Sequence, residues 1–328
     1  MLPPLTFHPV YRRYLWGGRR FATTLGRELP PGDDFAESWE FVDHGADQSV
    51  VAAGPLAGTT LGSLVRERAT DLLGRHAGPR AFPLLFKFLD AQRDLSVQVH
   101  PDDARAARLT PPDLGKTEAW YVVDVAAGSR IYAGLREGVG KPDLEAAIRA
   151  GRCADVLHAF EPRAGECVFI PAGTVHAIGG GLLVAEIQQA SDVTYRLFDW
   201  NRTGPDGRPR PLHIDAGLDA VTRLGPVVPV TPTATADPAV RRLVTCEYFS
   251  FDEVAPRMEW QVGGDDTCHL LSVISGEITL DPAWGLPPLR RGSCLLLPAS
   301  LPRQRLRATA GADGPAKLLH VTPGGAAT

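Results

Sequence analysis

The chain of 328 residues lacks any apolar run that approaches the roughly 18 residues needed to span a membrane. Its first eight residues show no basic segment followed by an apolar one, so we expect no signal peptide. The five cysteines form no C-x-x-C pair, which predicts reduced thiols in a cytoplasmic protein. The net charge of −4 argues against the basic surface that a nucleic-acid partner requires. We therefore expect neither a membrane nor a nucleic acid as partner.

Glycine and proline are plentiful instead. The 34 glycines and 29 prolines separate short apolar runs and form no low-complexity block or solenoid repeat. This pattern is typical of an all-β protein with many turns. The length favours two domains. We place the boundary in the Pro- and Thr-rich stretch 222–238, which leaves a first domain at 1–225 and a second at 240–325.

A few peripheral helices interrupt the β pattern. Residues 60–68 have apolar side chains near helical spacing after a candidate N-cap at Thr59 or Thr60. Residues 142–149 begin with proline and end before Gly151, which predicts a short helix.

The stretch 95–103 is the most informative part of the chain. Its apolar residues alternate with Ser96, Gln98 and His100, so a strand here places the three polar groups on one face. Polar groups on the inward face of a strand are costly unless something binds them. Pro101 then ends the ladder because it has no N–H to donate. We interpret this strand as one wall of a metal-binding cavity.

A second motif supports a small barrel around that cavity. Gly165, Pro171, Gly173 and His176 have the spacing G-x5-P-x-G-x2-H, the second signature of the cupin superfamily. We expect two antiparallel strands to meet at the Pro-x-Gly turn, with His176 pointing into the barrel. The fold class expected from this motif is a jelly-roll barrel.

Four residues form a candidate ligand set: Gln98, His100, Glu118 and His176. Gln98 and His100 stand where cupins carry their first His-x-His pair, and Glu118 stands where they carry a carboxylate. Two imidazoles, one carboxylate and one amide oxygen suit a single Zn²⁺ with a position left for water or substrate. Fe²⁺ or Mn²⁺ stays open as an alternative, because two histidines and a carboxylate also serve non-haem iron.

Lys87 interrupts the nearly continuous apolar run 82–89. A lysine in such a strand is usually an edge residue whose ammonium group reaches water. The alternative is a cation placed in the cavity for an anionic ligand.

With these motifs the chain resembles the type I mannose-6-phosphate isomerases, in their short bacterial form. The resemblance covers most of residues 8–215 in family order. It is carried by Trp16–Gly18, Glu37–Glu40, Phe86–Asp90, Leu95–Asp103, Gly115–Glu118, Val175–Gly179 and Ala185–Arg196. It implies an all-β fold with a few peripheral helices and two cupin barrels. It also implies one zinc ion per chain and the reversible conversion of mannose 6-phosphate to fructose 6-phosphate through a cis-enediol.

The same resemblance assigns roles to the site residues. It makes His100, Glu118 and His176 zinc ligands, with Gln98 as the fourth. It places Lys87 and Ser96 near the substrate phosphate and Arg196, Glu186 and Lys116 beside the reacting atoms, and it suggests that Trp16 and Glu37 line the mouth of the pocket.

An aldose–ketose isomerase needs a base and positive charge near the developing oxyanion. Glu186 is our first candidate for the base, and its alternative role is to orient a metal ligand. Arg196 and Lys116 would stabilise the enediolate, while Lys87 and Ser96 would anchor the phosphate.

The second domain repeats part of the cupin pattern. Gly292 and Pro298 keep the G-x5-P spacing, but Ser300 replaces the turn glycine and Arg303 stands at the histidine position. His269 occupies the carboxylate position, with no His-x-His before it. We predict a second barrel without a metal and with a structural role.

Two other functions use parts of this site. An iron-dependent cupin dioxygenase would need the same histidines and carboxylate, and a non-catalytic sugar-phosphate sensor would need Lys87 and Ser96. Lys87, Lys116 and Arg196 suit an anionic sugar better than an apolar substrate, and the complete ligand set favours an enzyme over a sensor. The expected partner is a hexose phosphate, and the expected assembly is a monomer or a homodimer.

Overall fold

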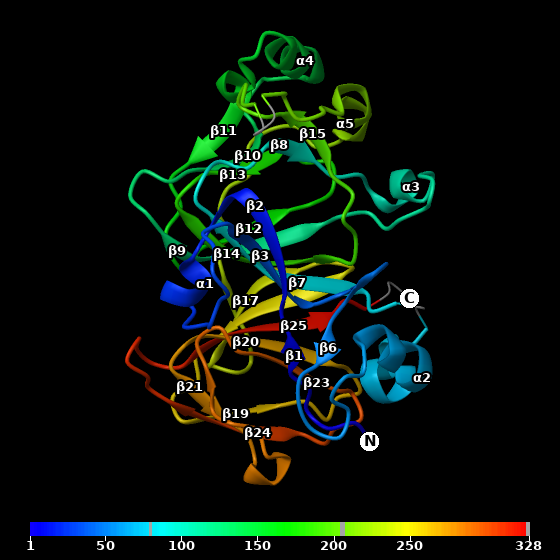
Figure 1. The fold of residues 1–328 in the computed structure, drawn as a ribbon, viewed down its shortest axis with the longest axis vertical. Helices are drawn as coiled ribbons and strands as arrows, with labels where there is room; N and C mark the ends of the chain where they lie inside the picture. The colour runs from blue at the N-terminus through cyan, green and yellow to red at the C-terminus, as the bar shows by residue number, and fades with distance from the viewer. Residues whose placement is uncertain (79–80, 204–206, 326–328) are drawn as a thin grey trace.

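Antiparallel sheets dominate the computed structural model, which describes residues 1–78, 81–203 and 207–325. Four larger sheets are stacked along the long axis of the molecule (Figure 1). Successive sheets have five, six, six and four strands. The prediction of a mostly β fold with two cupin-like barrels and a few peripheral helices is confirmed.

The first two sheets form the first barrel around a core that includes Trp120, Ile131 and Ile178. The five-stranded sheet has the order β11 (Leu157–Phe160), β10 (Ile131–Leu135), β13 (His176–Ile178), β8 (Val97–Val99) and β15 (Tyr195–Phe198). The six-stranded sheet has the order β12 (Cys167–Ile170), β9 (Glu118–Val125), β14 (Leu182–Gln189), β7 (Leu84–Ala91), β3 (Phe35–Phe41) and β2 (Val10–Gly18).

The other two sheets form the second barrel around Trp260, Leu271 and Leu306. Its six-stranded sheet has the order β16 (Thr233–Ala234), β17 (Val240–Thr245), β18 (Phe249–Val254), β25 (Lys317–Pro323), β20 (His269–Ser275) and β23 (Cys294–Leu297). Its four-stranded sheet has the order β19 (Glu259–Val262), β24 (Gln304–Thr309), β21 (Glu277–Thr279) and β22 (Leu289–Arg290).

Short strand pairs and helices complete the fold. The pairs join β1 (Phe7–His8) to β6 (Val50–Val51) and β4 (Asp43–His44) to β5 (Asp47–Gln48). The helices are α1 (Arg20–Thr23), α2 (Leu61–Leu73), α3 (Asp103–Ala106), α4 (Lys141–Arg149) and α5 (Ile214–Ala220), with 3₁₀ turns η1 (Gly74–His76), η2 (Cys153–Val156) and η3 (Pro282–Trp284).

Both predicted helices are present as α2 and α4. Thr60 caps α2, because its side-chain oxygen accepts a hydrogen bond from the Ser63 backbone N–H at 3.1 Å. Gly151 follows α4 with a φ of +68°, a left-handed conformation that glycine adopts without strain. Within the described ranges, no helix is both long and apolar enough to cross a membrane.

The middle of the stack explains why β7, β9 and β14 are so apolar. One face of this sheet lines the first barrel, and the other packs against the second barrel, so the strands are buried on both sides. Side chains such as Phe86, Tyr121 and Ile187 point toward Phe249 and Val321 of the neighbouring sheet. The alternate residues face the first barrel and carry its polar groups.

Lys87 belongs to this inward face. The edge-strand interpretation of Lys87 is wrong, because β7 lies between β14 and β3 in the middle of the sheet. Its side chain is only 6% exposed, so it is a buried cation of the cavity.

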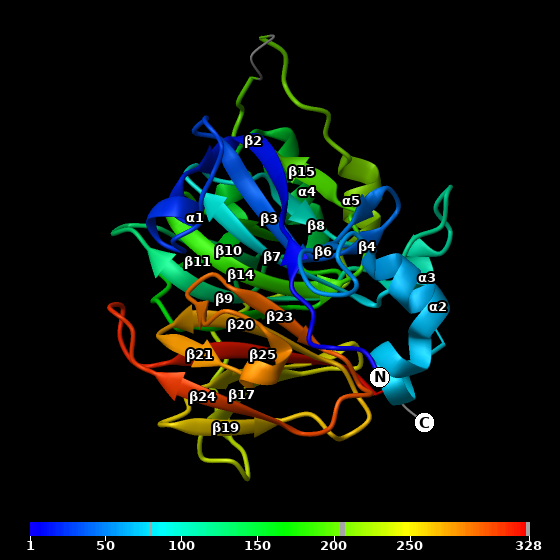
Figure 2. The same cartoon turned by 60° about the horizontal axis from the view of Figure 1, so that its bottom comes forward.

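The start of the chain runs past both barrels (Figure 2). Leu5 exchanges two backbone hydrogen bonds of 2.8 and 2.9 Å with Leu296 of β23. At the end of α2, Leu72 and Asp71 accept backbone hydrogen bonds from Ala299 and Ser300. The N-terminal residues therefore pack against the second barrel before β2 and β3 join the first.

Candidate active site

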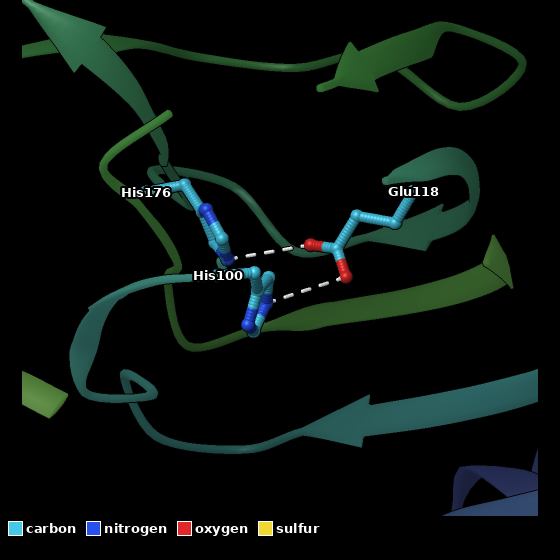
Figure 3. Close-up of side chains that lie close together, drawn as sticks. All are labelled: His100, Glu118 and His176. Carbon is cyan, nitrogen blue, oxygen red and sulfur yellow. Dashed lines mark ion pairs between the residues drawn. The ribbon is translucent and has the colours of Figure 1, made fainter. Parts of the chain in front are cut away.

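Three buried side chains converge inside the first barrel. His100 follows β8, Glu118 begins β9 and His176 begins β13, and one ligand atom of each lies within 4.8 Å of the others. His176 Nε2 lies 3.3 Å from Glu118 Oε1, and His100 Nε2 lies 3.5 Å from Glu118 Oε2. Figure 3 shows both rings turned toward the carboxylate. Ligands about 2.0–2.1 Å from one metal ion lie at roughly such separations from each other.

Backbone carbonyl groups orient both imidazole rings. His100 Nδ1 donates to the Val193 carbonyl and His176 Nδ1 to the Thr174 carbonyl, each at 2.9 Å. A carbonyl can only accept, so Nδ1 carries the ring proton and Nε2 presents its lone pair to the cavity. Burial, followed by the charge of Lys116, lowers the pKa of His100 to about 3, and burial also lowers the pKa of His176. Both histidines are thus neutral, which is the form that binds metals.

Glu118 supplies the negative charge. Burial opposes its ionisation, but the ammonium group of Lys116 holds the pKa of this carboxyl well below its usual range. Among the residues that the structure describes, neither carboxylate oxygen has a hydrogen-bond partner, although Lys116 Nζ lies 2.9 Å from Oε2. Two imidazole lone pairs and an ionised carboxylate therefore face one another with no proton between them. This donor set fits a divalent cation.

Gln98 lies at the edge of this set. Its Nε2 is 3.2 Å from His176 Nε2. A half-turn of the terminal amide would present Oε1 at the same place, and an amide oxygen is a metal ligand where the nitrogen is not. The position fits a fourth ligand.

The Pro171–Gly173 turn places His176, but not in the expected way. The two strands that it joins do not pair with each other, because β12 belongs to the six-stranded sheet and β13 to the five-stranded one. The turn carries the chain across the barrel wall. Gly173 has a φ of +85°, and a Cβ there would lie 2.0 Å from Thr222 Oγ1, so the crossing requires glycine.

A cleft with a volume of about 260 Å³ opens beside these ligands. The structure brings together in its lining all seven residues expected to act on the substrate: Trp16, Glu37, Lys87, Ser96, Lys116, Glu186 and Arg196. Gln98 also lines the cleft and connects it to the metal ligands.

Glu186 and Lys87 form the charged centre of the cleft. Lys87 Nζ lies 3.2 Å from Glu186 Oε1 and 3.4 Å from Glu37 Oε2. Although burial opposes its charge, these carboxylates raise the pKa of Lys87 above its ordinary value. Trp120 Nε1 donates to Glu186 Oε2 at 3.0 Å. Burial and the charge of Glu118 raise the pKa of Glu186, which suits a general base.

Arg196 and Ser96 form a second polar group in the cleft. Arg196 Nε donates to Ser96 Oγ at 3.2 Å, and its Nη1 donates to the Pro211 carbonyl at 3.1 Å. An anion bound beside Ser96 would meet a guanidinium as well as a hydroxyl group.

The lining residues that were not predicted as site residues from the sequence include Tyr14, Asp192 and Arg210. Tyr14 stacks on Trp16 with ring centroids 5.6 Å apart, and its position two residues before Trp16 could have indicated a shared strand face. Arg210 belongs to a Gly- and Pro-rich segment after β15, whose composition does not indicate a place in the cleft. Two hydrogen bonds of 2.8 and 2.6 Å to Asp199 draw it back to the cleft.

Comparisons with known proteins agree with this geometry. The family model of the type I phosphomannose isomerase catalytic domain matches residues 5–119. Mannose-6-phosphate isomerase ManA of Bacillus subtilis is 36% identical over 308 residues, which cover 91% of this chain and 94% of the relative. The mannose-6-phosphate isomerase of Streptococcus mutans is 34% identical over 309 residues, with 92% and 94% covered.

A solved structure gives the same result for the fold. The crystal structure of mannose 6-phosphate isomerase from Bacillus subtilis superposes with a TM-score of 0.86 at 30% identity. The superposition covers 98% of this chain and 99% of that one, so it includes both barrels. The chain belongs to the type I mannose-6-phosphate isomerase family.

Proposed function

We propose that the protein interconverts mannose 6-phosphate and fructose 6-phosphate. The observation that carries this proposal is one cleft that joins a set of metal ligands to the buried carboxylate of Glu186 and four cationic side chains. An aldose–ketose isomerisation needs a base and positive charge near the developing oxyanion, and the cationic side chains suit a sugar substrate that is an anion. The relatives that share more than a third of the sequence carry the name of this activity.

Glu186 is the proposed base. Trp120 Nε1 donates to Oε2, and Oε1, which faces Lys87 Nζ at 3.2 Å, is the proposed proton acceptor. Starting from mannose 6-phosphate, Glu186 Oε1 takes the proton from C2 to form a cis-enediol and returns it to C1. A second proton passes from the oxygen on C2 to the oxygen on C1. The aldehyde at C1 thus becomes an alcohol and the alcohol at C2 a ketone, with no net gain or loss of protons.

Positive charge stabilises the intermediate and holds the substrate. Lys116 Nζ lies 3.8 Å from Glu186 Oε1, where it can face the developing oxyanion together with Arg196. Lys87 and Ser96 anchor the phosphate, and the hydrogen bond from Arg196 to Ser96 brings the guanidinium to the same anion. Trp16 and Glu37 are among the residues that line the cleft, and we propose that they stand at its mouth.

Zinc is the proposed metal. His100, Glu118 and His176 would hold it, with Gln98 as a fourth ligand, because two imidazoles and a carboxylate suit Zn²⁺. When bound, zinc supplies positive charge that orients and polarises substrate oxygens.

We propose that this catalytic domain spans residues 1–225 and that residues 240–325 form a second barrel without a metal. The partner is a hexose phosphate, and the assembly is a monomer or a homodimer. We place the protein in the cytoplasm, because its five cysteines are unpaired.

The test is an isomerisation assay on mannose 6-phosphate with detection of fructose 6-phosphate. It is run on the purified protein, after chelation, and after addition of zinc. We expect activity to be lost on chelation and restored at one zinc per chain, as measured by metal analysis. Absence of isomerisation in every state, with one zinc bound, would overturn the proposal.

A further inference from the structure

Two tyrosines connect the barrels through hydrogen bonds of the same kind. Tyr248, in the turn between β17 and β18, donates to Asp103 Oδ2 at 2.6 Å. Tyr121, in β9, donates to Glu253 Oε2 at 2.6 Å. Each bond joins a phenol to a carboxylate across the two barrels. The two carboxylates differ in what else they hold.

Asp103 holds the segment that carries Lys116. Its Oδ1 accepts from the Gly115 backbone N–H at 2.7 Å and from Gln189 Nε2 at 2.9 Å. Gln189 in turn accepts from the Thr117 backbone N–H through Oε1 at 2.9 Å, and its own backbone N–H donates to the Thr117 carbonyl. The residues on both sides of Lys116 are therefore fixed through one carboxylate.

Close packing reinforces this connection. A Cβ on Gly115 would lie 2.6 Å from the Asp103 backbone nitrogen and 2.7 Å from the Asp102 carbonyl carbon. The Lys116 backbone N–H donates to the Pro101 carbonyl at 3.1 Å. The segment 115–117 thus lies directly on the segment 101–103, and a displacement of one moves the other.

The position of Lys116 must be held closely because its ammonium group lies near several groups of the site. Its Nζ lies 2.9 Å from Glu118 Oε2, 3.1 Å from His100 Nε2 and 3.8 Å from Glu186 Oε1. Misplacement of a catalytic group by a fraction of an ångström to an ångström can lower a rate greatly. Glu253, by contrast, pairs with Arg241 and Lys317 of its own barrel and makes no such contact with the Lys116 segment.

We propose that Tyr248 of the second barrel is a positioning residue for Lys116, acting through Asp103, Gly115 and Gln189. This inference rests on the proposed isomerase function. It gives the second barrel a part in the reaction beyond packing, because a side chain outside the first barrel holds the Lys116 segment in place.

The test compares Tyr248→Phe with Tyr121→Phe, a matched control that removes an inter-barrel hydrogen bond of the same type and length. Tyr248→Phe is expected to lower kcat roughly tenfold, as loss of an outer partner of a site commonly does. Its KM for mannose 6-phosphate should stay within about twofold, because the phosphate-binding groups are untouched. Tyr121→Phe should show the same fall in Tm with the kcat of the wild type. Equal kcat values for the two variants would overturn the inference.

A measurement without turnover separates this inference from the proposed function. Hydrogen–deuterium exchange should accelerate in peptides that cover residues 115–117 in Tyr248→Phe and stay unchanged in Tyr121→Phe. If the wild type does not isomerise the sugar, the proposed function fails while exchange still tests the positioning. Unchanged exchange at 115–117 in Tyr248→Phe would contradict the inference even in an active enzyme.

Asp103 provides an isosteric variant. Asp103→Asn keeps one oxygen for Gly115 and Gln189, and its amide group can donate to the Tyr248 hydroxyl, so most of kcat should remain. Asp103→Ala removes every partner and should lower kcat more than Tyr248→Phe. An Asn variant as impaired as the Ala variant, at equal Tm, would overturn the proposed connection.

Discussion

Lys87 and Glu186 stand directly opposite each other on β7 and β14, with their charged atoms 3.2 Å apart and both side chains buried. The pair places a cation beside the oxygen that we propose to be the proton acceptor. Because Glu37 also contacts Lys87, the lysine keeps a carboxylate partner when Glu186 gives up its charge by accepting a proton. The base can therefore change charge without leaving an isolated buried ammonium group.

Glu186→Gln tests the base. The amide keeps the shape and can still accept from Trp120, but it cannot take a proton from carbon. We expect kcat to fall by roughly 10²- to 10⁴-fold, with zinc content and Tm close to the wild type. Incorporation of solvent deuterium at C2 of mannose 6-phosphate should fall in parallel. Near-normal turnover would leave Glu186 only an orienting role.

Arg196→Ala tests the stabilisation of the intermediate. Loss of the guanidinium should lower kcat by roughly 10²- to 10³-fold while zinc stays bound, because removing one group that faces developing negative charge has an effect of that size. Arg149→Ala is the control, since Arg149 is an exposed arginine on α4 that pairs with Glu145. Turnover near the wild-type value would remove Arg196 from the mechanism.

Lys87→Ala tests the phosphate site. We expect KM for mannose 6-phosphate to rise, because the lysine is proposed to hold the phosphate, and kcat to fall as well, because Glu186 loses its cationic neighbour at 3.2 Å. Inhibition by inorganic phosphate should weaken in the same variant. Lys141→Ala, at the exposed start of α4, should change neither value. An unchanged KM in Lys87→Ala would move the phosphate site elsewhere.

The lowered pKa of Glu253 predicts how the stability of the fold depends on pH. Burial opposes its charge, but hydrogen bonds from Tyr121 and Arg241 and the charge of Lys317 hold its pKa below the ordinary value of 4.5. A carboxyl whose folded-state pKa is lowered stabilises the fold above its unfolded pKa, and this contribution disappears as pH falls through the folded value. At pH 7 the Tm of the wild type should be well above that of Glu253→Gln. This difference in Tm should disappear as the pH falls below about 4.5. A gap independent of pH would contradict this account.

The site could be predicted from sequence where local alternation decides it. Because successive side chains of a strand point to opposite faces, the polar positions in 95–100 already place Ser96, Gln98 and His100 together. The environment of Lys87 could not be predicted in this way. Its central place depends on β14 and β3, which pair with β7 from far away in the chain.

The features that the sequence did not predict were missed for similar reasons. Arg210 reaches the cleft only because Asp199 binds it, a contact that no local pattern indicates. The Pro171–Gly173 turn has a recognisable motif, but the motif does not say whether the strands on either side pair or separate. Tyr248 lies outside residues 8–215, whose motifs indicated the family from the sequence, and its hydrogen bond to Asp103 appears only when the two barrels are seen together.

The sheet that contains β7, β9 and β14 limits how far this protein could be shortened. A truncated chain that ended near residue 225 would keep every ligand and every catalytic group. It would also expose the outer face of that sheet, where Phe86, Phe88, Tyr121 and Ile187 form a continuous apolar surface. Apolar surface of that extent promotes aggregation in water. A shortened enzyme would therefore need polar residues in place of the apolar ones on the outer face of this sheet before the first barrel could be used alone.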